Sequence, residues 1–589
     1  MKKTLLFILT LFILQPLYSQ NVKIKFIETS DIHGQLFPYD FINDKPSNHS
    51  LAQIYSYVKE ERAKEDQHVV LLDDGDILQG QPDVYYYNFV RPDTTHILAS
   101  MMNFMGYDAA AVGNHDIEAG HPVYDKLADE FDFPWMAANA VSDSTGEPYF
   151  QPYKIIEVEG IKIAVLGMIT PHIPHWLPEK IWYGMHYEDM IECAEKWVKI
   201  IKEKENPDLM VGLFHAGVDY KYGNVDENTY KNENASVLVA EKVKGFDIVF
   251  VGHDHHGWNE FVPDNFGDSV LIVGTKAYAA NIGEAVVNLT FDKDSGKWKT
   301  DNISGNLIPT ESYEPDEEFM QKFGYAERQT KEYVSKPIGE LTEAISAKDA
   351  IFGDAAFTDV INNIQLKLSG ADVSFAAPLS FGAGIDKGTI YVRDMFDLYK
   401  YENLLYTMKL TGQEIKDYLE FTSSIWFNQM KDKDDDLLNF AKDDNGNVVY
   451  SSGNVPKLKA PYYNFDAAEG IDYIIDVSKS EGERVTITGF SNGSPFDLSA
   501  TYKVAINSYR GNGGGGHLIQ GAGLSHDELT NRIITSTERD LRFYMIQWIE
   551  EQKVITPETT HNWKIVPEEW YEAGREKDSK LLFNHGTME

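Results

Sequence analysis

Five short apolar segments in the first half of the chain each run into an aspartate, asparagine or histidine, and this repeated pattern constrains the fold more than any other feature. The segments alternate with helical patterns, which indicates a layered α/β fold. In open α/β sheets, ligands bind beyond the carboxyl ends of the strands, so the polar residues that follow the segments can converge on one site. The segments are 23–27, 69–72, 109–112, 209–214 and 248–251, and the residues after them include Asp31, His33, Asp76, Asn114, His215, His253 and His255.

The residue types at these strand ends are those that bind transition-metal ions. Imidazole and carboxylate groups suit Zn, Mn and Fe, and a two-metal site needs a bridging carboxylate with separate ligands for each ion. Asp31 and His33 are two positions apart, so both can face one ion where a strand gives way to a turn. Gly75 and Gly113 each precede a candidate ligand and allow a tight backbone turn beside it. Any one of these residues alone is more often structural, but the five strand ends together favour a metal centre.

The chain is long enough for two domains. Its 589 residues exceed what a single hydrophobic core usually supports. The first α/β pattern occupies residues 21–310, and a charged helical pattern within residues 311–337 predicts a helical linker. A second α/β unit is therefore expected over residues 338–589.

The charge of the chain limits its partners. A formal net charge of -39 argues against a nucleic-acid polymer or an anionic membrane surface, because both would be repelled. A small anionic substrate requires the site to supply its own positive charge, and bound divalent cations are the obvious source.

The amino-terminal segment predicts export. Lys2 and Lys3 precede an apolar run over residues 5–14, and residues 1–20 together have the order of a secretory signal peptide. A retained membrane anchor is the weaker interpretation, because the run is shorter than the roughly 20 residues that span a bilayer. We therefore expect a periplasmic or secreted protein with no membrane contact after cleavage; the oligomeric state stays open.

These motifs resemble those of a known superfamily. Asp31 with His33, Asp76, residues 113–116, His215 and residues 252–255 match, in this order, the five blocks of the calcineurin-like metallophosphoesterases. Residues 398–405 and 507–517 resemble the carboxy-terminal substrate domain of the bacterial 5′-nucleotidase family. The resemblance implies an α/β fold in which a four-layer β-sandwich with flanking helices is followed by an α/β substrate domain.

The resemblance also implies a role for each site residue. It assigns Asp31, His33 and His255 to one ion, Asn114, His215 and His253 to the other, and Asp76 to a bridge between two divalent ions of Mn, Zn, Co or Fe. In this superfamily a metal-bound water or hydroxide attacks phosphorus in line. His115 matches the residue that stabilises the phosphoryl oxygens or assists the leaving oxygen. Glu118 stands where 5′-nucleotidases have Asp and cyclic phosphodiesterases often have Asn, and its carboxylate can still orient His115.

Within the family the likeness is strongest to the 2′,3′-cyclic-nucleotide 2′-phosphodiesterase/3′-nucleotidases, through residues 76–82, 170–177, 464–473 and 509–516. Tyr401 and Tyr509 match the two aromatic residues that sandwich the base in this family. From the sequence pattern alone, core packing would be a commoner role for these tyrosines than base binding. Asp386 stands where 5′-nucleotidases commonly have a substrate-binding Arg, which counts against that activity.

These features are compatible with three functions. The first is hydrolysis of 2′,3′-cyclic nucleotides and 3′-nucleotides, and the second is 5′-nucleotidase or UDP-sugar hydrolase activity. The third, from another class, is non-catalytic binding of nucleosides. His115 beside a complete ligand set argues against a mere binding protein, since binding requires neither.

Overall fold

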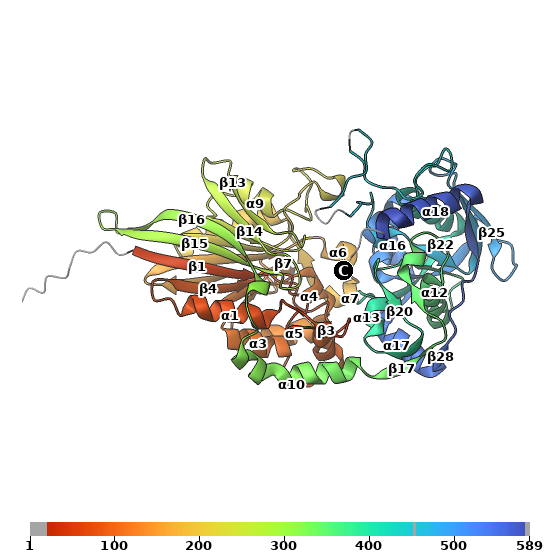
Figure 1. The fold of residues 1–589 in the computed structure, drawn as a ribbon. Helices are drawn as coiled ribbons and strands as arrows, with labels where there is room; N and C mark the ends of the chain where they lie inside the picture. Colours follow the sequence, from red (N-terminus) through yellow and green to blue (C-terminus); the bar gives the residue numbers. More distant parts are fainter. Residues whose placement is uncertain (1–20, 444, 452–454, 584–589) are drawn as a thin grey trace, which may run out of the picture.

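A computed structural model of the chain describes residues 21–443, 445–451 and 455–583, so the predicted signal peptide at 1–20 lies outside the described residues. Two halves lie side by side (Figure 1). Helix α10 (Glu317–Val334) runs along the first half and leads into strand β17 (Pro337–Leu341) of the second. The helix falls within the predicted linker; the domain boundaries at 310 and 337 stay predictions.

The first half contains two six-stranded sheets. One has the order β16-β15-β1-β4-β5-β6, with β1, β4, β5 and β6 parallel, and the other has the order β13-β14-β12-β11-β9-β8, with β9, β11, β12 and β14 parallel. Their bounds are β1 Asn21–Thr29, β4 His68–Asp73, β5 Ala109–Ala111, β6 Trp135–Met136, β8 Tyr153–Val158, β9 Ile161–Ile169, β11 Leu209–His215, β12 Ile248–Val251, β13 Trp258–Pro263, β14 Ser269–Gly274, β15 Asn281–Asp292 and β16 Lys297–Pro309.

The five predicted apolar segments are the strands β1, β4, β5, β11 and β12. Every residue of β11 and β12 is buried. Near-continuous apolar runs are typical of parallel strands that are covered on both faces. The central parallel strands therefore lie inside the first half, with their ends free to carry a site.

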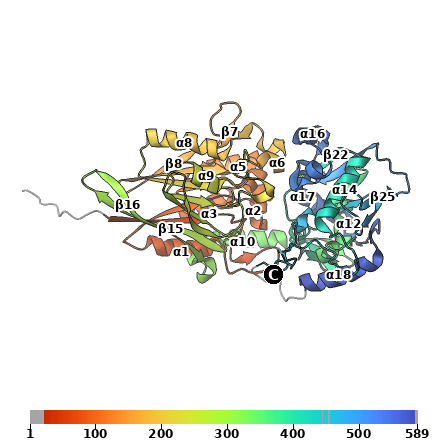
Figure 2. The same ribbon diagram turned by 90° about the horizontal axis from the view of Figure 1, so that it is seen from above.

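Helices cover the outer face of each sheet. α1 (Leu51–Arg62), α3 (Ile97–Met105) and α5 (His121–Glu130) pack with α10 on the first sheet, and α8 (Met190–Lys204) and α9 (Ser236–Lys242) pack on the second. A separate core with side chains from both sheets, such as Phe26 and Phe250, lies between them. α8 and α1 accordingly lie on opposite sides of the first half (Figure 2). The four-layer β-sandwich predicted from the sequence is confirmed.

Helix α8 shows how the sequence produces this packing. Its Met190, Cys193, Trp197 and Ile201 recur at intervals of three or four residues and are all buried on the second sheet. The side chain of Asp189 accepts hydrogen bonds from the first free backbone N–H groups and begins the helix. The apolar stripe therefore decides which face of the helix is buried.

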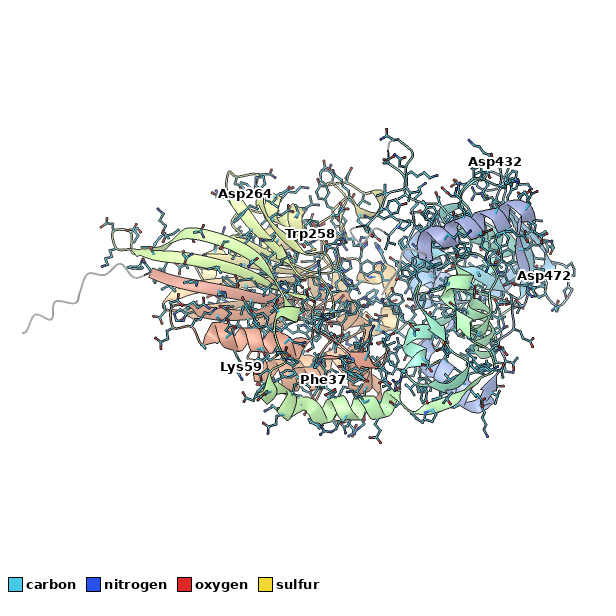
Figure 3. All side chains as sticks on the ribbon, in the orientation of Figure 1. Phe37, Lys59, Trp258, Asp264, Asp432 and Asp472 are labelled. Carbon is cyan, nitrogen blue, oxygen red and sulfur yellow. The ribbon has the colours of Figure 1, made fainter. Side chains whose placement is uncertain are left out.

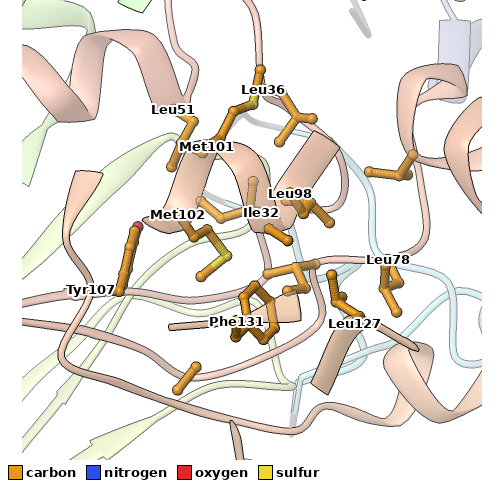
Figure 4. Packing of buried hydrophobic residues seen from close by; sticks show 14 of the residues in the cluster. Ile32, Leu36, Leu51, Leu78, Leu98, Met101, Met102, Tyr107, Leu127 and Phe131 are labelled. Carbon is orange, nitrogen blue, oxygen red and sulfur yellow. The ribbon is translucent and has the colours of Figure 1, made fainter. Parts of the chain in front are cut away.

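The first core also anchors loops that carry candidate ligands. Ile32 and Leu78 pack among Leu98 and Met102 of α3 and Leu127 of α5 (Figure 4). Both are fully or almost fully buried, and each lies next to or near a candidate ligand in the chain. Packing of these side chains therefore fixes the loops after β1 and β4.

The second half is built on a five-stranded mixed sheet of order β23-β19-β26-β22-β27. Helices α12 (Ala356–Ser369) and α17 (Leu541–Gln552) contribute to one core beside this sheet, and α14 (Gly412–Trp426) contributes to another. This is the expected α/β unit. Its strands are β19 Val373–Ala376, β22 Leu405–Thr411, β23 Ala467–Glu469, β26 Thr501–Asn507 and β27 Ile533–Ser536.

Hydrogen bonds join the two halves. Tyr85 donates its hydroxyl proton to Asp540 at 3.0 Å, and Asn512 donates to the carbonyl oxygen of Trp176 at 3.2 Å.

Charged residues such as Asp264 and Asp432 lie toward the outer surfaces of the halves (Figure 3). Among the described residues, every helix is too short or too polar to cross a bilayer.

Candidate metal and catalytic site

The candidate ligands stand on sharp turns at one edge of the two sheets. Because the parallel strands of each sheet end on the same side, the loops after β1, β4 and β5 meet those after β11 and β12. Most of the candidate ligands have positive φ, a conformation that costs a non-glycine residue about 1 to 3 kcal/mol. Such strain persists only where the surrounding structure demands it, and here it turns the side chains toward one another. These residues are Asp31 (φ 51°), His33 (φ 48°), Asp76 (φ 57°), His253 (φ 74°) and His255 (φ 60°).

The side chains form two groups that share one carboxylate. In the first group, ligand atoms of Asp31, His33, Asp76 and His255 all lie within 4.8 Å of one another, and in the second those of Asp76, His215 and His253 do so. Asn114 joins the second group, because its Oδ1 lies 2.8 Å from Nδ1 of His253 and 3.2 Å from Nε2 of His215. The two groups contain the residues that the family resemblance assigns to two ions, and Asp76 is common to both groups.

The hydrogen bonds of the histidines test whether the site fits metal ions. Nδ1 of His33 lies 3.0 Å from the carbonyl oxygen of Gln79, and Nδ1 of His215 lies 2.5 Å from that of Asp74. Each of these nitrogens donates a proton to its carbonyl oxygen, so in the neutral imidazole each Nε2 has a lone pair. Nε2 of His33 then faces Nε2 of His255 at 3.0 Å, and Nε2 of His215 faces Oδ2 of Asp76 at 3.2 Å. Converging lone pairs of this kind fit bound cations.

Burial and charge set the protonation states of this site. Burial raises the pKa of Asp76, but His215 and His115 outweigh it and hold the pKa of that carboxyl well below its usual range. Burial lowers the pKa of His33 to about 3, with a further contribution from His255. An ionised bridging carboxylate beside a neutral imidazole is the form that binds metal ions.

Two glycines let the loops approach closely. A Cβ atom on Gly75, which has φ +89°, would lie 2.5 Å from the backbone nitrogen of Gly113. A Cβ atom on Gly113 would lie 2.2 Å from Oδ1 of Asp76. The predicted need for glycine beside the ligands thus has a steric cause.

His115 lies beside the shared carboxylate. It follows Asn114 in helix α4 (Asn114–Glu118), and its backbone N–H donates to Oδ1 of Asp76 at 2.8 Å. Its Nδ1 lies 2.5 Å from Oε2 of Glu118, three residues later on the same helical face. Burial lowers the pKa of His115, but Asp76 and then Glu118 outweigh it and raise the pKa to about 9. Glu118 is therefore placed to orient the ring.

Three further residues support the site but escaped the sequence analysis. The carboxylate of Asp116 accepts hydrogen bonds from the backbone N–H groups of Gly113 and Asp76, and so ties together the loops after β4 and β5. Oε1 of Glu233 lies 3.1 Å from Nε2 of His253. The ring of Trp176 stacks on His253, with the ring centroids 5.5 Å apart. Asp116 stands within a matched block and could have been found; the surroundings of Glu233 in the sequence resemble those of any surface acid.

The second half brings tyrosines toward this edge. Tyr278 of the first half lies 5.2 Å from the ring of His33, and it also interacts with Tyr401 and Lys400 of the second half. Burial lowers the pKa of Lys400, but Tyr278 and other neighbouring tyrosines outweigh it and raise the pKa. Lys400 is therefore a cation near the candidate metal ligands.

The ring of Tyr509 packs against the backbone of the glycine run, residues 513–516. A Cβ atom on Gly514 would lie 2.5 Å from the Tyr509 ring, so only glycine fits there. The guanidinium of Arg510 pairs with Asp466, with Nε 2.9 Å from Oδ2, and thereby fixes the neighbouring segment. Burial raises the pKa of Tyr401, and neighbouring tyrosines that include Tyr509 add to the shift. Asp386 is exposed between strands β20 (Gly384–Ile385) and β21 (Gly388–Tyr391).

Two family models match the chain. Residues 24–257 match the calcineurin-like phosphoesterase model, and residues 337–521 match the model of the 5′-nucleotidase C-terminal domain. These matches agree with the fold of the two halves and with the position of the ligand groups in the first.

Curated relatives match across both halves. The chain is 27% identical to the 2′,3′-cyclic-nucleotide 2′-phosphodiesterase/3′-nucleotidase of Salmonella typhimurium, over 93% of this chain and 89% of that protein. It is 26% identical to the trifunctional nucleotide phosphoesterase protein YfkN of Bacillus subtilis, over 93% of this chain but only 39% of that longer protein. A crystal structure of a 5′-nucleotidase precursor from Thermus thermophilus shares the fold, with a TM-score of 0.60 and 20% identity over 93% of this chain and 100% of that chain.

Proposed function

The chain belongs to the 5′-nucleotidase family of calcineurin-like phosphoesterases and is a phosphoric ester hydrolase, and from this premise we propose that it hydrolyses 2′,3′-cyclic nucleotides and 3′-nucleotides with two divalent metal ions. One observation carries the proposal: two groups of ligand atoms share Asp76, and His115 lies directly beside that residue. A dinuclear centre requires such a shared carboxylate.

Each ion has its own set of side chains in this proposal. Asp31, His33 and His255 hold one ion, Asn114, His215 and His253 hold the other, and Asp76 bridges them. When bound, such ions act as Lewis acids and lower the pKa of water toward neutrality. The donor set suits Mn, Zn, Co or Fe.

The remaining site residues act on the substrate. His115 donates to a phosphoryl or leaving oxygen through Nε2, because its Nδ1 is bonded to Glu118. Tyr401 and Tyr509 stack on the base, which contributes about 1 to 3 kcal/mol per base. Lys400 adds positive charge for an anionic substrate in a chain whose net charge is -39.

The preference for cyclic and 3′-nucleotides is supported by the relatives. Proteins named for this activity match nearly the whole chain, and Asp386 replaces the Arg common in 5′-nucleotidases. The second candidate is 5′-nucleotidase or UDP-sugar hydrolase activity, which the fold likeness to a 5′-nucleotidase precursor favours.

The proposal also includes export of the protein after cleavage of residues 1–20. Sequencing the amino terminus of the mature protein tests this part of it.

A substrate panel decides between the two activities. The purified protein is stripped with a chelator, reloaded with Mn, Zn, Co or Mg, and assayed with 2′,3′-cyclic AMP, 3′-AMP, 5′-AMP and UDP-glucose. We expect the highest kcat/KM for 2′,3′-cyclic AMP or 3′-AMP. If 5′-AMP or UDP-glucose is the best substrate, the second candidate takes its place.

A further inference from the structure

A second group of acidic side chains lies in the other half of the molecule. Asp354 and Asp359 stand just before and within the first turn of α12, and Glu469 ends β23. One carboxylate oxygen from each lies within 4.8 Å of the other two. Residues 559–562, nearly a hundred positions beyond Glu469, bring Thr560 and Asn562 to the same place.

The backbone N–H of Thr560 donates to Oδ2 of Asp359 at 3.0 Å, and three side-chain oxygens surround the hydroxyl group of the same residue. Oγ1 of Thr560 lies 2.5 Å from Oε1 of Glu469, 3.4 Å from Oδ2 of Asp359 and 3.1 Å from Oδ1 of Asn562. A hydroxyl has a single proton, so it can satisfy only one of these three acceptors. The amide of Asn562 cannot be turned to help, because its Nδ2 already donates to two carbonyl oxygens, each at 2.8 Å.

The carboxylate of Asp354 is buried in this group. Its side chain is only 9% exposed, and among the described residues neither of its oxygens has a hydrogen-bond partner. Nδ1 of His561 lies 3.9 Å from Oδ2 of Asp354, on a ring that is 84% exposed. A buried carboxylate without a partner is costly, and such groups in folded proteins are paired or bind metal ions.

The pKa values of Asp354 and Glu469 are both raised. Burial, and next the charge of Asp359, raises the pKa of Asp354 to about 7, and burial is also the main reason that the pKa of Glu469 rises to about 8. Burial is the larger cause of both shifts, and the charges of the neighbouring carboxylates add to it.

A cavity of about 300 Å³ lies beside Asp354, which is the member of the group that lines it. Ser346, Thr559 and Arg575 also line it, and Arg575 is paired with Asp349 at 3.5 Å rather than with Asp354. The cavity can therefore admit an ion together with water molecules.

We propose that Asp354, Asp359, Glu469, Thr560 and Asn562 form an oxygen-only binding site for Ca²⁺. Ca²⁺ takes six to eight oxygen ligands in flexible geometry, whereas Mg²⁺ demands a near-ideal octahedron. The five side chains offer carboxylate, hydroxyl and amide oxygens, and water from the cavity completes the set. The ion clamps the start of α12, the end of β23 and the 559–562 segment together, and so stabilises the second half.

Calcium binding to the full chain tests this site separately from catalysis. The protein is first saturated with Zn²⁺, which fills the histidine-rich ligand groups and has little preference for oxygen-only sites, and CaCl₂ is then titrated by calorimetry and equilibrium dialysis. We expect one Ca²⁺ per chain, at least tenfold weaker competition by Mg²⁺, and a rise in Tm of about 5 °C at saturation. Asp354→Asn and Glu469→Gln should abolish this equivalent. Asp349→Asn, which removes an exposed carboxylate at the same cavity, should retain it.

Three results would overturn the proposed Ca²⁺ site. The proposal is overturned if the wild type binds no Ca²⁺ at millimolar concentration, if the acidic variants keep the bound ion, or if Mg²⁺ binds more tightly. Circular dichroism checks that each variant folds. If the acidic variants do not fold, Thr560→Val takes their place, because it preserves shape and removes one oxygen: a tenfold loss of affinity supports the site, and unchanged affinity overturns it.

Discussion

The contact between His115 and Glu118 makes a quantitative prediction. Glu118→Ala removes a carboxylate 2.5 Å from Nδ1 of His115 while leaving every candidate metal ligand in place. A hydrogen bond to a charged group contributes about 1.5 to 3 kcal/mol. At about 1.4 kcal/mol per tenfold change, kcat should fall about 10- to 150-fold, with little change in KM.

A double-mutant cycle distinguishes positioning from a general structural effect. His115→Ala should lower kcat by about 10² to 10⁴, the scale of positioned acid-base and electrostatic groups. If Glu118 acts only through His115, the double variant should be no slower than His115→Ala alone. The assay is hydrolysis of bis(p-nitrophenyl) phosphate, with metal content measured for each variant. Additive losses in the double variant, or loss of metal from Glu118→Ala, would refute the positioning role.

Three other predictions follow from the same structure. Tyr401→Ala or Tyr509→Ala should weaken nucleotide binding by about 1 to 3 kcal/mol in KM and hardly affect bis(p-nitrophenyl) phosphate; equal effects on both substrates would exclude base stacking. Lys400→Met should raise KM for nucleotides about tenfold without loss of metal, as expected for a charge-assisted contact, and an unchanged KM would remove it from the substrate site. Glu61 has a side chain only 4% exposed and lies 2.8 Å from Nζ of Lys25. Burial raises its pKa, but hydrogen bonds from Lys25 and other groups outweigh it and lower the pKa to about 2. A lowered folded-state pKa gives stability that is present above about pH 4.5 and lost as the pH falls toward 2. Glu61→Gln should therefore lower Tm by several degrees at pH 7, and scanning calorimetry should show the difference shrinking in acid; a constant difference would contradict the assigned shift.

The strands of the first half and the polar residues that follow them could be predicted from the sequence, because these patterns are local. Each apolar run is a strand, each is followed by a polar residue, and parallel strands of one sheet end together, so Asp31 and Asp76 were expected on one side of a sheet. That the second sheet brings His215 to the same place is a feature of the folded structure. The alternation of strand and helix predicted the α/β class, and the family resemblance supplied the number of layers. Periodicity therefore located the strands and their polar ends, and the resemblance supplied the rest of the fold prediction.

Contacts between distant segments could not be predicted in the same way. Glu233 lies near His253 because of how the loop after β11 folds, and no periodic pattern encodes that path. Asp354 and Glu469 are more than a hundred positions apart and meet Thr560 only in the folded second half. Each of these residues looks like an ordinary polar surface residue in the sequence, and its role depends on partners that only the tertiary structure supplies.

The metal content of Asp76→Asn tests the central claim most directly. Wild-type protein reloaded with Mn²⁺ or Zn²⁺ and desalted should contain two equivalents of transition metal by mass spectrometry, because two ligand groups meet at Asp76. Asp76→Asn should lose both ions and all turnover, His253→Ala should lose about one equivalent, and the exposed control His256→Ala should keep both. Full metal content and near-wild-type turnover in Asp76→Asn would contradict the account.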